Sequence, residues 1–103
     1  MTPAVLHILL SLSTEDRHGL GIAADVKAFS GGRVALGPGT LYGTIKRLLD
    51  AGLVEDLGQA SAEDDDPRRR YYRITAKGRR ALELETASLA SVVGVARRRL
   101  KTS

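Results

Sequence analysis

The middle of the chain carries the clearest pattern of apolar and polar positions. Leu41, Ile45 and Leu48 recur at i, i+4 and i+7, which places them on one face of a helix. Pro38 suits the first helical turn, and Gly52 suits the position just past the last turn. The opposite side carries polar or small residues, namely Thr40, Gly43, Lys46, Arg47 and Asp50. An apolar back with a small and basic front fits a DNA major groove, although ordinary surface helices share this amphipathic pattern.

A second apolar stretch, at the N-terminus, has almost no polar face. Thr2 and Pro3 suit the cap and the first position of a helix. The next residues are apolar over most of the helix circumference: Val5, Leu6, Ile8, Leu9, Leu10 and Leu12. Such a helix requires burial on more than one side, so we expect Leu6 and Leu9 to meet a partner subunit. His7 lies within this run and is expected to pack there rather than to bind a ligand.

Helical spacing returns after a polar break. Ile22, Val26 and Phe29 recur at i, i+4 and i+7, so we expect their common face to be buried. The Ser-Gly-Gly sequence at residues 30–32 ends this helix and turns the chain. Residues 34–36 alternate weakly and predict a short strand.

Two stretches with strand character flank a polar tract in the second half of the chain. Residues 53–57 form the first, and residues 70–75, with Tyr72 and Ile74 on one face, form the stronger second. The tract between them, rich in acidic and small residues, is typical of a loop tip. The expected fold class is therefore mainly α with a small β-hairpin. Three helices followed by such a hairpin form a winged helix-turn-helix.

A long final helix is expected after the hairpin. Thr75 suits its cap, and no proline interrupts residues 76–100. Its apolar residues recur with near-heptad spacing: Leu82, Leu89, Val93, Ala96 and Leu100. The helix would reach roughly 35 Å, more than so small a domain can cover. We therefore expect residues 1–75 to form a DNA-binding domain and residues 76–103 a C-terminal dimerisation helix.

Charge is distributed unevenly along the 103 residues. The formal net charge is +4, but residues 55–67 carry −6 and residues 68–80 carry +7. A basic block of this strength fits a polyanionic partner. The arginines of this block, Arg68, Arg69 and Arg70, are expected to divide between phosphate contact and pairing with the acidic loop tip at residues 64–66.

The composition leaves little material for catalysis or metal binding. There is no cysteine, which excludes disulfides, thiolate metal ligands and a cysteine nucleophile. The two histidines, His7 and His18, lie on different expected elements, and neither has a nucleophile beside it. Asp64, Asp65 and Asp66 lack the glycine and glutamate of a calcium loop. We therefore expect no enzyme, no cofactor and no metal site.

The sequence also bears on the compartment. No apolar run approaches the ~20 residues that a membrane span requires. The N-terminus lacks the basic region, apolar core and cleavage site of a secretory leader. These features predict a cytoplasmic protein.

Several side chains on the central helix are candidate DNA contacts. Lys46 and Arg47 can reach phosphates or base edges, and Arg47 can bind a guanine in a bidentate manner. Thr40 can donate to a phosphate that the helix dipole also attracts, or it can act only as a cap. The Tyr42 hydroxyl can bond a phosphate while its ring packs inward, or the whole residue can serve packing.

Two segments of the sequence together resemble the PadR-like transcriptional regulators, a family of winged-helix repressors. These are GPGTLYGTIKRLLDAGLVE and RRRYYRITAKGRRAL, and the pair His18-Gly19 also matches. The resemblance implies a homodimer bound to double-stranded operator DNA. It implies that Thr40, Tyr42, Lys46 and Arg47 lie on the DNA-facing helix and that Arg69, Arg70 and Tyr71 belong to the wing.

The sequence departs from that family at three positions. Leu20 and Gly21 stand where an aromatic residue and a glutamate are common, and Gly43 stands where a larger residue is usual. Members of the family sense small molecules, so an effector of unknown identity is implied as well. Tryptophan, which some members use to stack flat ligands, is absent. The aromatic residues are Phe29, Tyr42, Tyr71 and Tyr72, which gives little support to such a pocket.

Two functions of different classes remain. The first is a dimeric, sequence-specific DNA-binding regulator, a repressor on a palindromic operator. The second is a winged-helix module whose basic face binds an acidic protein partner. Steep salt dependence and sequence preference in duplex binding distinguish the first from the second.

Overall fold

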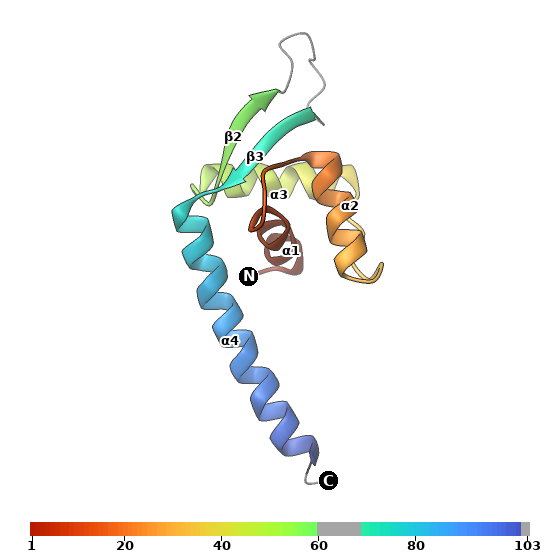
Figure 1. Ribbon diagram of the computed structural model, residues 1–103, viewed down its shortest axis with the longest axis vertical. Helices are drawn as coiled ribbons and strands as arrows, with labels where there is room; N and C mark the ends of the chain where they lie inside the picture. The colour runs from red at the N-terminus through yellow and green to blue at the C-terminus, as the bar shows by residue number, and fades with distance from the viewer. Residues whose placement is uncertain (60–68, 102–103) are drawn as a thin grey trace.

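The computed structural model describes residues 1–59 and 69–101, and this part of the chain contains four helices and a three-stranded antiparallel sheet (Figure 1). The elements follow one another as α1 (Pro3–Leu12), β1 (Arg17–His18), α2 (Gly19–Phe29), α3 (Pro38–Asp50), β2 (Val54–Gln59), β3 (Arg70–Ile74) and α4 (Ala76–Lys101). This is the winged-helix architecture with a long C-terminal helix, as the sequence predicted.

Side chains cap three of the four helices, and the caps of α1 and α4 are the ones that the sequence predicted. Thr2 Oγ1 accepts from the Val5 N–H at 3.2 Å at the start of α1. His18 Nδ1 accepts from the Gly21 N–H at 2.9 Å at the start of α2. Thr75 Oγ1 accepts from the Gly78 N–H at 3.0 Å in the first turn of α4. Each contact satisfies an amide that has no partner within its helix.

A glycine turn ends α3. Gly52 has a φ of 75°, a left-handed conformation that glycine adopts without a steric penalty. Its N–H donates to the Leu49 carbonyl at 3.1 Å, and the Leu53 N–H donates to the Leu48 carbonyl at 2.9 Å. This pair of hydrogen bonds is a Schellman motif, which confirms the expected end of the helix and directs the chain into β2.

The sheet has the order β1-β3-β2, and both pairings are antiparallel. The expected strand at residues 34–36 was wrong, because this segment forms a loop in which the Val34 N–H donates to Ser30 Oγ at 3.0 Å. The third strand is Arg17–His18 instead, paired with residues 71–72 of β3. Its two polar residues show no alternation, and only the exposed edge of β3 makes them a strand.

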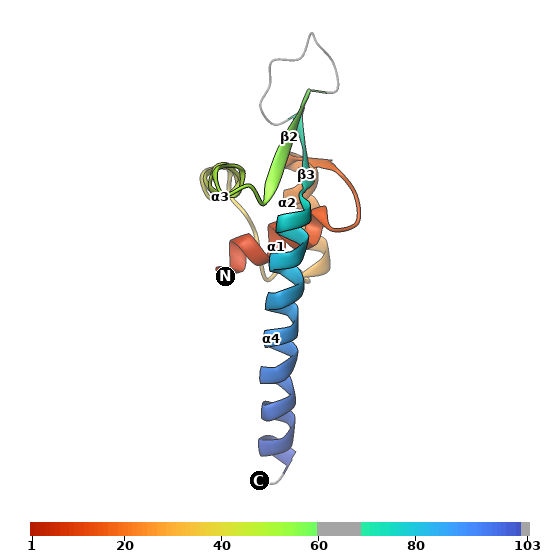
Figure 2. The ribbon, with the colours of Figure 1, turned by 90° about the vertical axis from the view of Figure 1, so that its left-hand side faces the viewer.

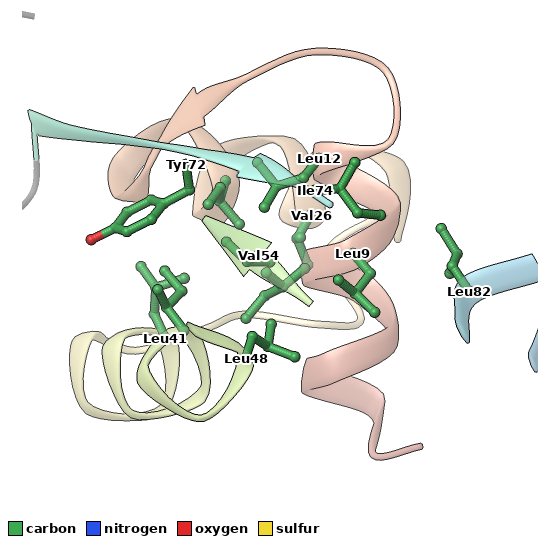
Figure 3. Packing of buried hydrophobic residues seen from close by; sticks show 12 residues of the cluster. Leu9, Leu12, Val26, Leu41, Leu48, Val54, Tyr72, Ile74 and Leu82 are labelled. Carbon is green, nitrogen blue, oxygen red and sulfur yellow. The ribbon is translucent and has the colours of Figure 1, made fainter. Parts of the chain in front are cut away.

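The hydrophobic core lies where α1, α2, α3 and the sheet converge (Figure 3). It contains Ile8, Leu9, Leu12, Ile22, Val26, Leu41, Ile45, Leu48, Val54, Tyr72, Ile74 and Leu82. Phe29 was expected among them, but its side chain is exposed. It lies at the far end of α2 and stacks on His7 with ring centroids 5.6 Å apart.

Helix α4 leaves the rest of the described chain as a separate arm (Figures 1 and 2). Its buried residues are Gly78 and Leu82, both in its first two turns. Large apolar residues after that point are exposed, namely Leu84, Leu89, Val92, Val93, Val95 and Leu100. Within residues 1–59 and 69–101, no helix combines the length and apolar character that crossing a membrane requires.

Candidate nucleic-acid interface

The outer face of α3 is open and carries the basic residues expected there. Lys46 and Arg47 are exposed, and so is Thr40 in the first turn of the helix. A Cβ atom built on Gly43 would meet no atom within 4 Å, so the backbone at that position is accessible to a close partner. The apolar back of the helix lies in the core, which fixes the direction of this face.

The side chain of Arg47 is held by its own helix. Its Nη2 donates to Thr44 Oγ1 at 3.3 Å, and Thr44 is completely buried. A buried hydroxyl has little freedom to move, so this contact restricts the guanidinium while leaving most of its donors available. Sequence periodicity gave no indication of this support, because Thr44 lies at the border between the apolar and polar faces.

Tyr42 serves packing in this conformation. Its hydroxyl oxygen is buried, and the ring lies against the backbone of Gly19 at the start of α2. A Cβ atom added at Gly19 would lie 2.4 Å from Tyr42 Oη, so any larger residue there would force the Tyr42 side chain to move. Burial, together with the negative charge of Asp56 and the neighbouring Tyr42, raises the pKa of Tyr72. Of the two alternatives for Tyr42, the structure favours packing over phosphate contact.

An ion pair crosslinks the two strands of the hairpin. Arg70 Nε donates to Asp56 Oδ2 at 2.9 Å, and the Gly58 N–H donates to Asp56 Oδ1 at 2.7 Å. Partial burial opposes ionisation of Asp56, but the hydrogen bonds from Arg70 and Gly58 outweigh it and lower the pKa of this carboxyl group. Arg70 therefore pairs with Asp56, a partner that the sequence analysis did not consider.

The other expected wing residues lie close by. Arg69 is exposed, and the half-buried Tyr71 packs edge-to-face on His18 with ring centroids 5.4 Å apart. The expected acidic tip, Asp64 to Asp66, and Arg68 lie outside the described residues.

A second ion pair ties the hairpin to the loop before β1. Arg73 Nε donates to Asp16 Oδ1 at 3.1 Å, and Arg73 Nη2 donates to Asp16 Oδ2 at 2.8 Å. Hydrogen bonding from Arg73 lowers the pKa of Asp16 below its usual value. The two residues are 57 positions apart, so no local pattern indicated the pair.

The open face of α3 and the hairpin belong to the same part of the molecule, and α4 points away from it (Figure 1). Contacts between α3 and β2 and between β2 and β3 fix the helix and hairpin relative to each other. A basic helix face beside a two-stranded hairpin is the geometry with which winged-helix proteins enter a groove and flank it.

Comparison with known proteins identifies the family. The model of the transcriptional regulator PadR-like family matches residues 5–84. This chain is a member of the PadR-like family. Among solved structures, a PadR-like transcriptional regulator from Bacillus cereus superposes with a TM-score of 0.76 at 26% identity, over 93% of this chain and 89% of that one.

Two further comparisons concern proteins that are longer than this PadR-like chain. Bacillus subtilis PadR, solved in complex with operator DNA, superposes with a TM-score of 0.69 at 20% identity, over 81% of this chain and 46% of that one. An uncharacterised 37.1 kDa protein in transposon Tn4556 of Streptomyces fradiae is 36% identical over 91 residues, 88% of this chain and 24% of that protein. The chain thus spans about a quarter of the length of this curated relative.

The residues expected at a dimer interface divide into two groups in this PadR-like fold. Leu9 and Leu82 were assigned to the interface, but both are buried in the core of their own chain. Leu6 is partly buried against the same core. The remaining candidates lie on the exposed part of α4: Leu89, Val93, Ala96 and Leu100.

An open pocket of about 290 Å³ lies where the hairpin meets the start of α2. It is lined by Glu15, Asp16, Arg17, His18, Gly21 and Tyr71. Its polar groups already bond to the protein: Asp16 to Arg73, and Arg17 Nε to the Ser11 carbonyl at 3.0 Å. We assign no effector to this pocket of the PadR-like fold.

Proposed function

We propose that this chain is a sequence-specific DNA-binding transcriptional regulator, a repressor that binds a palindromic operator as a homodimer. The observation that carries the proposal is the exposed face of α3, with Lys46 and Arg47, beside the hairpin. Membership of the PadR-like family of transcriptional regulators supports it. The similar fold of Bacillus subtilis PadR, which was solved with operator DNA, supports the same mode of binding.

We assign direct DNA contact to three residues of α3 and three of the wing. Thr40, Lys46 and Arg47 would enter the major groove, with Arg47 reading a base edge. Arg69, Arg70 and Tyr71 would lie along the adjacent backbone, where cations and phenol groups bond phosphates. Tyr42 is left out of this set, because its ring lies against Gly19 at the start of α2.

The exposed apolar strip on α4 supports the proposal of a dimer. Leu89, Val93 and Leu100 recur on one side of α4 and are exposed within the described part of the chain. A continuous apolar strip of this kind is a typical protein interface. Two-fold pairing of this strip matches the symmetry of a palindromic site, whose half-sites would lie ~10 bp apart, about one helical turn. On this proposal residues 1–75 bind DNA and the helix from residue 76 pairs the subunits.

Selection of bound sequences from a random duplex pool tests the proposal. We expect enrichment of a single inverted repeat. A titration against the selected duplex should lose affinity steeply with salt, because cationic contacts release counterions from DNA. Absence of any enriched sequence, together with affinity that stays flat between low and moderate salt, would instead favour the module that binds an acidic protein.

A further inference from the structure

The first turn of α4 is fastened to the turn that ends α3. Thr75 Oγ1 donates to the Gly52 carbonyl at 2.7 Å. Lys77 Nζ donates to the Ala51 carbonyl at 2.9 Å. Ala51 is the C-terminal cap of α3, so Lys77 places a positive charge at the negative pole of that helix. Two side chains at the start of the arm thus bond directly to the end of the helix proposed to read DNA.

Close packing and a third hydrogen bond complete this attachment. A Cβ atom added at Gly78 would lie 2.0 Å from the Leu53 carbonyl oxygen, so α4 approaches the chain after α3 as closely as backbone allows. On the other side, Arg79 Nη2 donates to the Ser13 carbonyl, the C-terminal cap of α1, at 2.9 Å. We call Thr75, Lys77, Gly78 and Arg79 the α4 joint.

Beyond the joint, Leu82 packs in the core and Glu85 pairs with the N-terminal amine of Met1 at 3.6 Å, and most of α4 lies past these two contacts. After Leu82, none of its described residues is buried. The 19 residues from Glu83 to Lys101 extend about 28 Å from that point, at 1.5 Å of rise per residue. A tilt of about 10° at the joint would move the far end by about 5 Å over that length. Small changes at the joint are therefore amplified along the arm.

We propose that Thr75, Lys77 and Arg79 are positioning residues that set the angle between α4 and α3. In a dimer paired through α4, this angle determines how far apart the two copies of α3 lie and how each enters its groove. The joint would thereby select the spacing of operator half-sites without touching DNA. This inference rests on the proposed function, because it requires a dimer that binds paired half-sites.

Lys77→Gln is the main test, because it removes the positive charge that Lys77 places at the Ala51 carbonyl. The side chain is exposed, so the core is unchanged. Arg80→Gln is the matched control. It removes the same charge from an exposed position on the same helix, three residues after Lys77. Lys77→Arg restores a long cationic donor and is the rescue variant. Thermal unfolding of all three variants should stay close to that of the unsubstituted protein.

Binding is measured on a duplex with one half-site and on a series with two half-sites at different spacings. We expect Lys77→Gln to bind the single half-site normally. It should bind the pair at the preferred spacing about ten-fold or more weakly, because the gain from a second contact depends on matching geometry. Its preference among spacings should broaden or shift. Lys77→Arg should recover the preference, and Arg80→Gln should keep it. Equal loss on single and paired sites, or an unchanged preference, would overturn the inference.

A spin-label distance measures the angle itself, independently of DNA. The chain has no cysteine, so labels can be placed at Gly39→Cys, where an added Cβ meets no atom within 4 Å, and at exposed Ser91→Cys. Dilution with unlabelled protein restricts the measurement to pairs within one chain. The distribution should be narrow in the Arg80→Gln background, and displaced or broadened in the Lys77→Gln background.

The two experiments separate failure of this inference from failure of the proposed function. If the unsubstituted protein selects no duplex, the proposed function fails, whatever the label distance shows. If it selects paired half-sites but Lys77→Gln leaves both the spacing preference and the label distance unchanged, only the role of the joint is refuted.

Discussion

Helices α3 and α4 are both amphipathic, but the described part of the chain buries the apolar face of α3 and leaves most of that of α4 exposed. On α3, Leu41, Ile45 and Leu48 are each 2% exposed. On α4, Leu89 and Val93 are 41% and 46% exposed, although their spacing is as regular. The same periodic signal in the sequence thus corresponds to a core in one helix and to a bare surface in the other.

The difference indicates which side of each helix is left for function. In α3 the apolar back is satisfied, so its polar front, with Lys46 and Arg47, is free to bind a partner of opposite charge. In α4 the apolar side remains exposed to water, which is energetically unfavourable. We therefore expect substitutions on the apolar side of α3 to affect folding, and those on the apolar side of α4 to affect association.

The largest expected effect is on the covered face. Ile45→Ala should lower the free energy of unfolding by about 4 kcal/mol, within the usual range for deleting a buried branched side chain. The matched variant Leu84→Ala, at an exposed position of α4, should change it by less than about 0.5 kcal/mol. Urea denaturation of both variants measures this contrast. Equal losses would show that the two helices do not differ as their exposure implies.

The next effect is on the bare face. Val93→Lys should weaken self-association by about 3 kcal/mol, because pairing through α4 would bury an unpaired charge in an apolar interface. Light scattering should give twice the chain mass for the unsubstituted protein and a shift towards monomer for the variant. Operator binding should weaken with it, while unfolding of the monomer stays unchanged. A protein that is already monomeric at micromolar concentration would contradict the proposed dimer.

A smaller effect is expected on the polar front of α3. Arg47→Ala should cost roughly 1–3 kcal/mol on the selected operator and less on random duplex, if Arg47 reads a base. Thr44→Val keeps the volume of the buried side chain but removes the oxygen that accepts from Arg47, so a weaker loss of the same kind is expected. Equal losses on operator and random duplex would make Arg47 a phosphate contact instead.

Local signals in the sequence were sufficient for most of the fold. Helix caps at Thr2 and Thr75, the glycine end of α3 and the strand character of residues 70–75 each act within a few positions, and all of them are present in the structure. Strand β1 was missed, because its two residues become a strand only through the edge of β3. A propensity scale has no access to such long-range pairing.

The errors at the candidate sites have a related cause. Periodicity shows that Leu9 and Leu82 lie on apolar faces, but it does not show which surface covers them, and both pack in their own core. The contacts of Arg73 with Asp16 and of Lys77 with the Ala51 carbonyl join residues 57 and 26 positions apart. Such contacts depend on the folded arrangement of elements, so the α4 joint could be found only in the structure.

The smallest expected effect concerns the ion pair between Asp56 and Arg70, which joins the two strands of the hairpin at its partly exposed surface. The pKa of Asp56 is lowered in the folded chain, so its contribution to stability is fully present above the unfolded value of about 3.9 and is lost as the pH falls through the folded value. Asp56→Asn should therefore lower the free energy of unfolding slightly at pH 7, and the difference from the unsubstituted protein should shrink as the pH falls below about 4 and vanish once the pH lies below the folded pKa. Partly exposed ion pairs contribute little, so the change should be smaller than the effects expected for Ile45→Ala, Val93→Lys and Arg47→Ala. Glu83→Gln on the exposed arm, as control, should leave the same pH profile unaltered. A difference for Asp56→Asn that persists in acid would mean that the substitution disturbs the packing around residue 56 and not only the charge of Asp56.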